Sequence, residues 1–331
     1  MIVKDYMNKG ISSFLMLLIS TFMGACIHEH PDVNADNPSG IEIGVELSLD
    51  LKWGEDETKP FFNTKARGNE SMRAVVEIAR NSVLVNRDEF YITQDEIDEG
   101  LARHKLPFKL DPAVYEMAIW CDTYNTDTQS SDFDASSLRE VSGNFKGIKL
   151  YDTRQCGYVS DLLDLRQYKD QLGVKLLKEL SLKHAGARFR LITTDMRQFV
   201  KKQLNEIEKG ETYTVTINYS TETADKFNAY SGYAIRDYSS NSITGPLVPT
   251  YSIYPETDLA EGFLFCDETD IVKMSVTVHN SARVLVVKSP EFSFEVKRGR
   301  IALVTGDFLS EVFSNHITVD NIWEGEIFID L

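Results

Sequence analysis

Apolar and other residues alternate along the first patterned stretch of the chain. From Ile41 to Trp53 every second residue is apolar. A period of two places these side chains on one face of an extended chain, so the stretch predicts a long β-strand with one buried face. The same period recurs at 72–78, 115–119, 187–191 and 213–219, and strand-like stretches also occupy 82–92 and 144–151.

A second run of short strand-like stretches fills the rest of the chain. It covers 261–266, 271–279, 282–288 and 290–297 and closes with GRIALVTGDFL, HITVDN and WEGEIFIDL. Two runs of short strands separated by turn signals are typical of β-sandwiches. The sequence therefore predicts a mainly β protein with a few short helices, with an N-terminal sandwich at 41–182 and a C-terminal sandwich at 183–331.

A helical period replaces the alternation at one place. Thr194 is the expected N-cap of this helix, and Gly210 is placed to end it. One face of the helix is apolar, through Met196, Phe199, Val200, Leu204 and Ile207.

Four other segments predict irregular or mixed structure. Residues 93–104 are polar and predict a short helix or a loop. Residues 122–137 are rich in Thr, Ser and Asp, which indicates a long exposed loop. Leucines spread among charges make 160–180 a partly helical segment, and 227–254 is an aromatic-rich loop.

The first 25 residues have the features of a lipoprotein signal peptide. Lys4 and Lys9 give a positive start, and the uncharged run 11–23 is shorter than the roughly 20 residues that span a bilayer. The run ends in Met23-Gly24-Ala25-Cys26, which resembles a lipobox. We expect cleavage between Ala25 and Cys26, diacylglycerol and N-acyl lipid on Cys26, and a polar tether at 26–40. An ordinary secretory signal, with Cys26 there by chance, is the alternative.

Acidic residues dominate the charge of the chain. Asp and Glu number 51 against 35 Lys and Arg, which gives a formal net charge of −16. Such a surface repels nucleic acid, so no nucleic-acid partner is expected. No later segment holds 18 uncharged apolar residues in a row, so lipid on Cys26 is the expected membrane attachment.

The sequence nominates no catalytic centre. It contains no HExxH, GxSxG, Walker or GxGxxG motif, so we expect no enzyme, no metal and no cofactor besides the lipid. His28 and His30 lack the further ligands that a metal site needs. Cys121, Cys156 and Cys266 are widely spaced and predict buried free thiols, with a Cys121–Cys156 disulfide as the alternative.

Two groups of side chains are candidates for contact with a partner. Tyr230, Tyr233 and Tyr238 could anchor a partner or stack on sugars, or they could cover a sandwich end. The basic run Lys297-Arg298-Gly299-Arg300 predicts a hairpin turn, and its alternative is a docking patch for an acidic partner.

Four segments together resemble the FimB/Mfa-type fimbrial anchor lipoproteins of Bacteroidales. The first is the lipobox at Cys26, and the second is FKLDPAVYEMAIWCD, in which Tyr115 and Trp120 match a Tyr…Trp strand of the family. The third is ARFRLITTDMRQFVKKQLNEIEKGETYTVTINYS, which looks like the start of the family's second domain. The closing GDFLSEVFSNHITVDNIWEGEIFIDL is the fourth, so the resemblance spans nearly the whole chain.

This resemblance implies two tandem transthyretin-like β-sandwiches and a structural role without catalysis. Such anchors attach fimbriae to the outer membrane through lipid, face the cell surface and limit fimbrial length, and their partners are the shaft subunits, or pilins. These subunits join by strand exchange, so Ile327, Phe328, Ile329 and Leu331 are candidates for docking a partner or for pairing within their own sheet. The alternatives are a surface glycan-binding lipoprotein of a polysaccharide uptake system and a hydrolase built on a β-sandwich.

Overall fold

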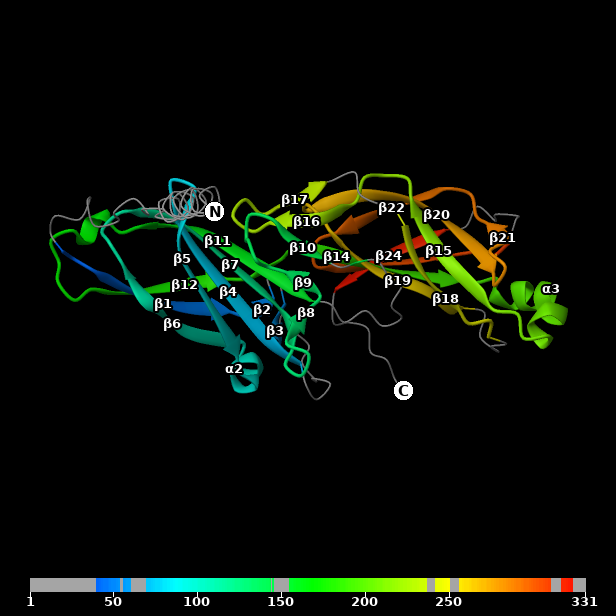
Figure 1. Cartoon of the computed structure of the whole chain (residues 1–331), viewed down its shortest axis with the longest axis horizontal. Coiled ribbons are helices and arrows are strands. Elements are labelled where there is room, and N and C mark those ends of the chain that lie inside the picture. Colours follow the sequence, from blue (N-terminus) through cyan, green and yellow to red (C-terminus); the bar gives the residue numbers. More distant parts are fainter. Residues whose placement is uncertain are drawn as a thin grey trace, which may run out of the picture.

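Two sandwich-like bodies lie end to end along the long axis of the molecule (Figure 1). They are seen in a computed structural model, which describes residues 40–53, 56–60, 70–143, 145, 155–236, 242–250, 256–310 and 317–323. The predicted fold class, mainly β with two tandem sandwiches and a few short helices, is confirmed.

The first sandwich packs a three-stranded sheet against a six-stranded sheet. The smaller sheet has the order β12 (Lys175–Ser181), β1 (Ile43–Asp50) and β6 (Leu101–Leu110), with β1 parallel to β12 and antiparallel to β6. The larger sheet has the order β13 (Lys183–His184), β11 (Cys156–Asp164), β7 (Val114–Asn125), β4 (Glu70–Arg80) and β5 (Val83–Ile92), with β8 (Ser130–Ser131) paired to β7. A short hairpin of β2 (Lys52–Trp53) and β3 (Asp56–Pro60) follows β1.

The core of this sandwich comes from the alternation seen in the sequence. Ile43, Leu47 and Leu49 of β1 are fully buried, as are Val76 and Ile119 on the facing sheet. The predicted strand at 41–53 is therefore confirmed, because its apolar face forms one wall of the core.

The second sandwich packs an eight-stranded sheet against a five-stranded sheet. The larger sheet has the order β24 (Thr318–Trp323), β23 (Arg300–Gly306), β14 (Gly186–Thr193), β19 (Thr257–Phe265), β16 (Ala224–Asn228), β10 (Val141–Gly143) and β9 (Phe133–Asp134), with β17 (Tyr233–Arg236) on β16. The smaller has the order β18 (Ser242–Leu247), β15 (Tyr213–Tyr219), β20 (Thr269–Asn280) and β21 (Leu285–Lys288), with β22 (Phe292–Lys297) on β20. Phe189, Ile217 and Val276 lie in the core between them.

Two short strands from the first half of the chain belong to the sheet of the second half. Val141 and Ser142 of β10 pair with Phe227 and Lys226 of β16, and β9 pairs with β10. The two sandwiches thus share a hydrogen-bonded ladder. The domain boundary between 182 and 183 stays a prediction. Strands β9 and β10 precede this boundary in the sequence but belong to a sheet whose other strands follow it.

Helices are short. Helix α2 (Gln94–Glu99) has Thr93 and Glu96 in a capping box, and η2 (Arg166–Tyr168) is one turn. Helix α3 (Met196–Glu208) begins one residue later than its predicted N-cap implied, because Asp195 and not Thr194 stands at the cap. Gly210, with φ of 87°, follows its end as predicted.

Two segment predictions are wrong and one is right only in part, because tertiary pairing overrides local pattern. Residues 160–180 are helical only at η2, and they also contain the end of β11 and most of β12, which pairs in parallel with β1. Residues 122–137 are no long exposed loop, since β7 runs to Asn125 and β8 and β9 follow. The stretch 227–254 contains β17 and β18 in place of a continuous loop.

Candidate functional site

A buried aromatic cluster joins the two sandwiches, and we call it the joint. It forms where the outer face of the six-stranded sheet meets the eight-stranded sheet, near the middle of the molecule (Figure 1). Alternation along β7 explains its position: Tyr115, Met117 and Ile119 face the first core, whereas Ala118 and Trp120 point the other way. The joint comprises Val75, Ala118, Trp120, Phe133, Ala135, Leu138, Val141, Cys156 and Tyr158 from the first half and Ala185, Ala224, Phe227, Ala229, Ala234, Phe263 and Phe265 from the second.

Trp120 is the centre of the joint. Its side chain is fully buried, and its ring lies 6.1 Å from each of the rings of Phe227 and Phe265, which belong to the second half. It also meets Phe133 edge-on at 5.6 Å. Aromatic pairs at such distances each contribute about 0.5–1.5 kcal/mol beyond the burial of their area.

Arg298 fastens the joint at its edge. Its guanidinium donates from Nη1 to the Tyr158 hydroxyl at 2.8 Å, and from Nη2 to the carbonyls of Gly232 at 2.9 Å and Cys266 at 2.7 Å. The carbon of the guanidinium also lies 5.5 Å from the centre of the Phe227 ring. With 14% of its side chain exposed, Arg298 is not available to an external partner.

The basic run 297–300 is therefore neither a hairpin nor an acidic-partner patch centred on Arg298. It is a turn that carries the chain from β22 in one sheet to β23 in the other. Gly232 makes the arginine contact possible, because a Cβ at this position (φ of 72°) would lie 2.4 Å from the Tyr158 hydroxyl.

A buried ion pair supports the joint from the first sandwich. Asp122 is fully buried and receives hydrogen bonds from Arg73 Nε at 3.1 Å and Arg73 Nη2 at 2.7 Å. Trp120 Nε1 donates to the same carboxylate at 3.0 Å, and Ser131 Oγ donates to it at 3.1 Å. Burial raises the pKa of Asp122, while these donors favour its charged form. The network holds the β7–β8 hairpin against the joint.

A second network ties Tyr230 to the first sandwich. Glu77, which is 4% exposed, accepts hydrogen bonds from Arg87, from the Leu138 amide and from the Tyr230 hydroxyl. Arg139 lies over the Tyr230 ring, 4.2 Å from its centre. Burial raises the pKa of Tyr230 well above its usual value. Tyr230 is thus occupied by contacts within the chain.

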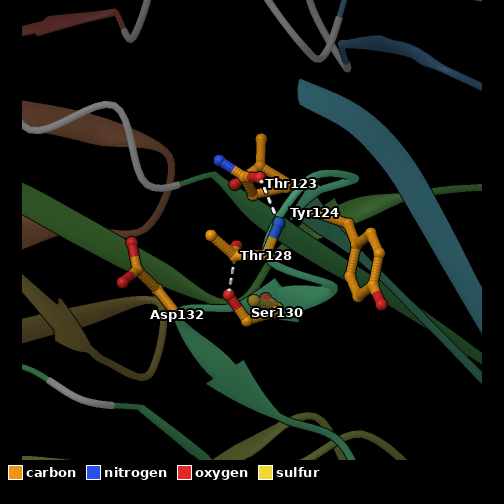
Figure 2. A pocket seen from close by; sticks show the side chains of 7 residues that line it. Thr123, Tyr124, Thr128, Ser130 and Asp132 are labelled. Carbon is orange, nitrogen blue, oxygen red and sulfur yellow. Dashed lines mark hydrogen bonds between the residues drawn. The ribbon is translucent and has the colours of Figure 1, made fainter. Parts of the chain in front are cut away.

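A polar pocket lies beside the ion-pair network at the β7–β8 hairpin. Figure 2 shows Thr123, Tyr124, Thr128, Ser130 and Asp132 around it, and its volume is about 220 Å³. The turn is held by Asn125 Oδ1, which accepts from the amides of Asp127 and Thr128 at 3.0 Å. Hydroxyl, amide and carboxylate groups beside a tyrosine are the groups that bind sugar hydroxyls and sugar faces.

The cysteines are buried thiols. Cys121, Cys156 and Cys266 are free, as predicted, and the alternative disulfide is wrong because Cys121 faces the first core while Cys156 faces the joint. Burial raises the pKa of Cys266 to about 12, so the thiol stays protonated and poorly nucleophilic.

The described part of the chain contains no group of three or more His, Cys, Asp or Glu side chains arranged to hold a metal ion. Nor does it contain a helix long and apolar enough to cross a membrane.

Most predicted site residues lie outside the described residues. This holds for Ala25 and Cys26, for Tyr238, and for Ile327, Phe328, Ile329 and Leu331. Tyr233 is 65% exposed on β17 and so remains a candidate contact, in contrast to Tyr230. The predicted roles of all these residues stay predictions.

Sequence reasoning missed the residues that build the joint. In the sequence, Trp120 is part of a strand motif and Arg298 is part of a basic run, and neither pattern predicts a contact between the two halves. One signal is present in the sequence: GFLFC at 262–266 has no polar side chain at five consecutive positions, which is typical of a strand buried on both faces.

A family model described as a family of unknown function, DUF6562, matches residues 38–330. Among curated proteins, none is similar enough in sequence to count as a relative.

Several solved structures of Bacteroidales proteins are similar to this chain in the path of the backbone. The fimbrial anchor protein Mfa2 from Porphyromonas gingivalis has 8% identity and a TM-score of 0.46, with 84% of this chain and 95% of that one covered. A candidate polysaccharide-binding protein from Bacteroides thetaiotaomicron has 11% identity and a TM-score of 0.46, covering 86% and 99%. A candidate adhesin from Bacteroides ovatus has 12% identity and a TM-score of 0.46, covering 87% and 96%.

Proposed function

The chain belongs to the family of unknown function DUF6562, and we propose that it is a lipid-anchored structural protein that attaches fimbriae to the outer membrane and limits their length. The observation that carries the proposal is the joint. Domains joined only by a linker move relative to each other by default, since their interfaces are small and polar. Here the sandwiches share an aromatic cluster, an arginine contact and the β10–β16 pairing.

A joint of this kind suits a protein that bears load. A fimbria pulls on its base, and the pull must pass to the lipid without separating the two sandwiches. Pairing of β10 with β16 resists such separation through backbone hydrogen bonds, and the Trp120 cluster resists it through buried apolar area.

The two proposed attachment segments lie next to different sandwiches in the sequence. Cys26 would carry the lipid and lies 15 residues before Ile41, at the start of the first sandwich. Strand β24 is the last strand in the order of the eight-stranded sheet of the second sandwich, and residues 327–331 follow it in sequence. We assign Ile327, Phe328, Ile329 and Leu331 to docking of a pilin, so that the partner and the lipid are held by segments at opposite ends of the sequence.

The proposed role is mechanical and involves no catalysis. The partners would be the membrane, through the lipid on Cys26, and the pilins of the shaft. The protein would face the cell surface. No further subunit could be added at the lipid-bound end of the anchor. The anchor would limit fimbrial length in this way.

Loss of the lipid tests the proposal. In cells carrying Cys26→Ala we expect the fold to persist and the fimbriae to appear in the medium, measured by immunoblot of cell and medium fractions. Met23→Leu is the matched control: it alters the same four-residue motif toward its commoner form and should keep fimbriae on the cells. If fimbriae remained cell-bound in Cys26→Ala cells, the proposed function would be wrong.

Glycan binding is the second candidate function, and the pocket in Figure 2 favours it. Tyr233, exposed on β17, is a separate candidate for stacking on a sugar. The unlipidated mature protein would be tested on a glycan array, with Asp132→Asn and Tyr233→Ala as variants. Binding that Asp132→Asn abolishes would support the pocket, and no binding to any glycan would rule this function out.

A further inference from the structure

The first sandwich has a distinct end on the side away from the joint, and we call it the tether end. Strand β1 begins there, with Ile43 opposite Leu110 and Gly44 opposite Lys175. The loop before β12 ends beside it, since the Gly44 amide donates to the Val174 carbonyl at 3.1 Å. The β4–β5 hairpin turns at the same end, because Ala79 lies opposite Glu116 and Val114 opposite Asp164. Residues 40–44, 80–84, 109–114 and 162–175 make up the tether end.

Apolar side chains protrude from the tether end. Leu172, in the loop between η2 and β12, is 86% exposed, which is the largest exposed fraction of any large apolar side chain in the described ranges. Val83, at the β4–β5 hairpin, is 58% exposed, and Leu84 is 48% exposed. Exposed apolar side chains at loop tips can enter an apolar surface, so these tips suit contact with a membrane.

The charge of the tether end differs from that of the whole chain. Its five basic residues are Arg80, Lys109, Arg166, Lys169 and Lys175, and its four acidic residues are Glu42, Asp111, Asp164 and Asp170. The end is therefore almost neutral, whereas the chain carries −16. Anionic lipid repels acidic surfaces, so this end can approach a membrane more closely than the rest of the protein can.

The tether enters the first sandwich at the tether end. The 15 residues from Cys26 to Gly40 span at most about 50 Å when fully extended. They lead directly into Ile41, so the tether end is the part of the described chain that lies nearest to the lipid along the sequence.

We propose that the tether end rests on the lipid surface, with Leu172 inserted among the outer acyl-chain segments and Val83 also in contact with lipid. The inference rests on the proposed lipid attachment through Cys26 and adds a second, non-covalent contact. That contact orients the sandwiches away from the membrane, so that the second sandwich stands outward. An apolar side chain that enters the headgroup boundary beside basic residues is a common mode of peripheral membrane binding.

Tryptophan fluorescence tests this contact in the lipidated protein. Leu172→Trp would be placed in vesicles whose phospholipid acyl chains are brominated near the headgroup, which quenches nearby tryptophan. Leu285→Trp is the matched control, since Leu285 is 50% exposed on β21, at the end of the second sandwich where α3 also lies (Figure 1). Both variants keep the native tryptophans, so the difference between them reports the introduced side chain.

In the Leu172→Trp variant we expect the emission of the introduced tryptophan to be lower in brominated vesicles than in vesicles of the same lipid without bromine, because its side chain lies at the headgroup boundary. In the Leu285→Trp variant we expect the added emission to remain unchanged. Protein that floats with the vesicles but leaves the tryptophan at position 172 unquenched would overturn the contact and leave the proposed function standing. Equal quenching of both variants would overturn the outward orientation. Protein that fails to float would overturn the lipid attachment, and this inference with it.

Discussion

Arg298 and Tyr158 are 140 positions apart in the sequence, yet the arginine guanidinium donates to the tyrosine hydroxyl at 2.8 Å. Arg298 comes from the turn between β22 and β23, and Tyr158 comes from β11 of the other sandwich. The same guanidinium donates to the carbonyls of Gly232 and Cys266, so one side chain closes this side of the joint.

Removal of the Arg298 side chain should weaken the joint. We expect Arg298→Ala to lower the free energy of unfolding by about 2–3 kcal/mol, because a charged group loses its hydrogen bonds and buried acceptors lose their donor. Denaturant unfolding would measure the loss. Lys297→Ala is the control, since Lys297 makes an exposed ion pair with Glu295 and its removal should change stability by less than about 0.5 kcal/mol. Equal losses for the two variants would contradict the role given to Arg298.

Trp120 should be the most sensitive residue of the joint. Trp120→Ala empties a fully buried site and removes a donor to Asp122, so we expect a loss of about 3–5 kcal/mol. Trp120→Phe keeps an aromatic ring and should lose less. Thermal unfolding followed by circular dichroism would compare them. A variant at exposed Tyr233, such as Tyr233→Ala, should unfold like the unsubstituted protein; a shift as large as that of Trp120→Ala would argue against a joint centred on Trp120.

Acid should destabilise the protein through His184. Burial, together with the positive charge of Arg298, holds the pKa of His184 well below 6.5. Unfolded histidine titrates near 6.5, so below that pH the unfolded chain binds a proton that the folded chain does not. Stability contributed by this group is thus complete above pH 6.5 and falls as the pH drops, by at most about 1.4 kcal/mol per pH unit.

His184→Gln removes the titrating group and should flatten this part of the curve of stability against pH. Unfolding in denaturant between pH 7 and pH 5 would measure the slope in both proteins. Identical slopes would mean that other groups cause the acid sensitivity.

The buried thiols should resist modification in the folded protein. Burial raises the pKa values of Cys121 and Cys266, the latter to about 12, so little thiolate forms at pH 8. We expect a thiol-specific reagent to label none of Cys121, Cys156 and Cys266 in native protein and all three after unfolding, as counted by mass spectrometry. Rapid labelling of native Cys156 would show that the joint opens.

Strands with one buried face were predictable because the cause of the pattern is local. From Ile41 to Leu51, and from Tyr213 to Tyr219, alternation alone identifies the face that is buried. The prediction of a loop at 122–137 was wrong because the burial of its first residue depends on a partner that is distant in the sequence. Asp122 looked like a loop residue, but its partner Arg73 lies 49 positions away and turns a polar residue into a buried one.

The joint could not be predicted from local patterns, because its contacts join residues that are distant in the sequence. Trp120, Phe227 and Phe265 come from three strands of two sheets, and no local period brings them together. The two candidate tyrosines differ in whether a partner can reach them. Tyr233 is exposed, whereas Tyr230 is in contact with Glu77 and Arg139. Residue type indicates what a side chain can do, but its neighbours in space decide whether it is free to do it.

The pairing of β10 with β16 has a consequence for how the protein is made. Strands β9 and β10, which complete the edge of the eight-stranded sheet, are synthesised before the rest of the second sandwich and are already present when β16 emerges from the ribosome. A fragment that began at residue 183 would lack β9 and β10 and would offer the edge of β16 to any other chain. The two halves therefore form one folding unit, in which the earlier half protects the later one from aggregation.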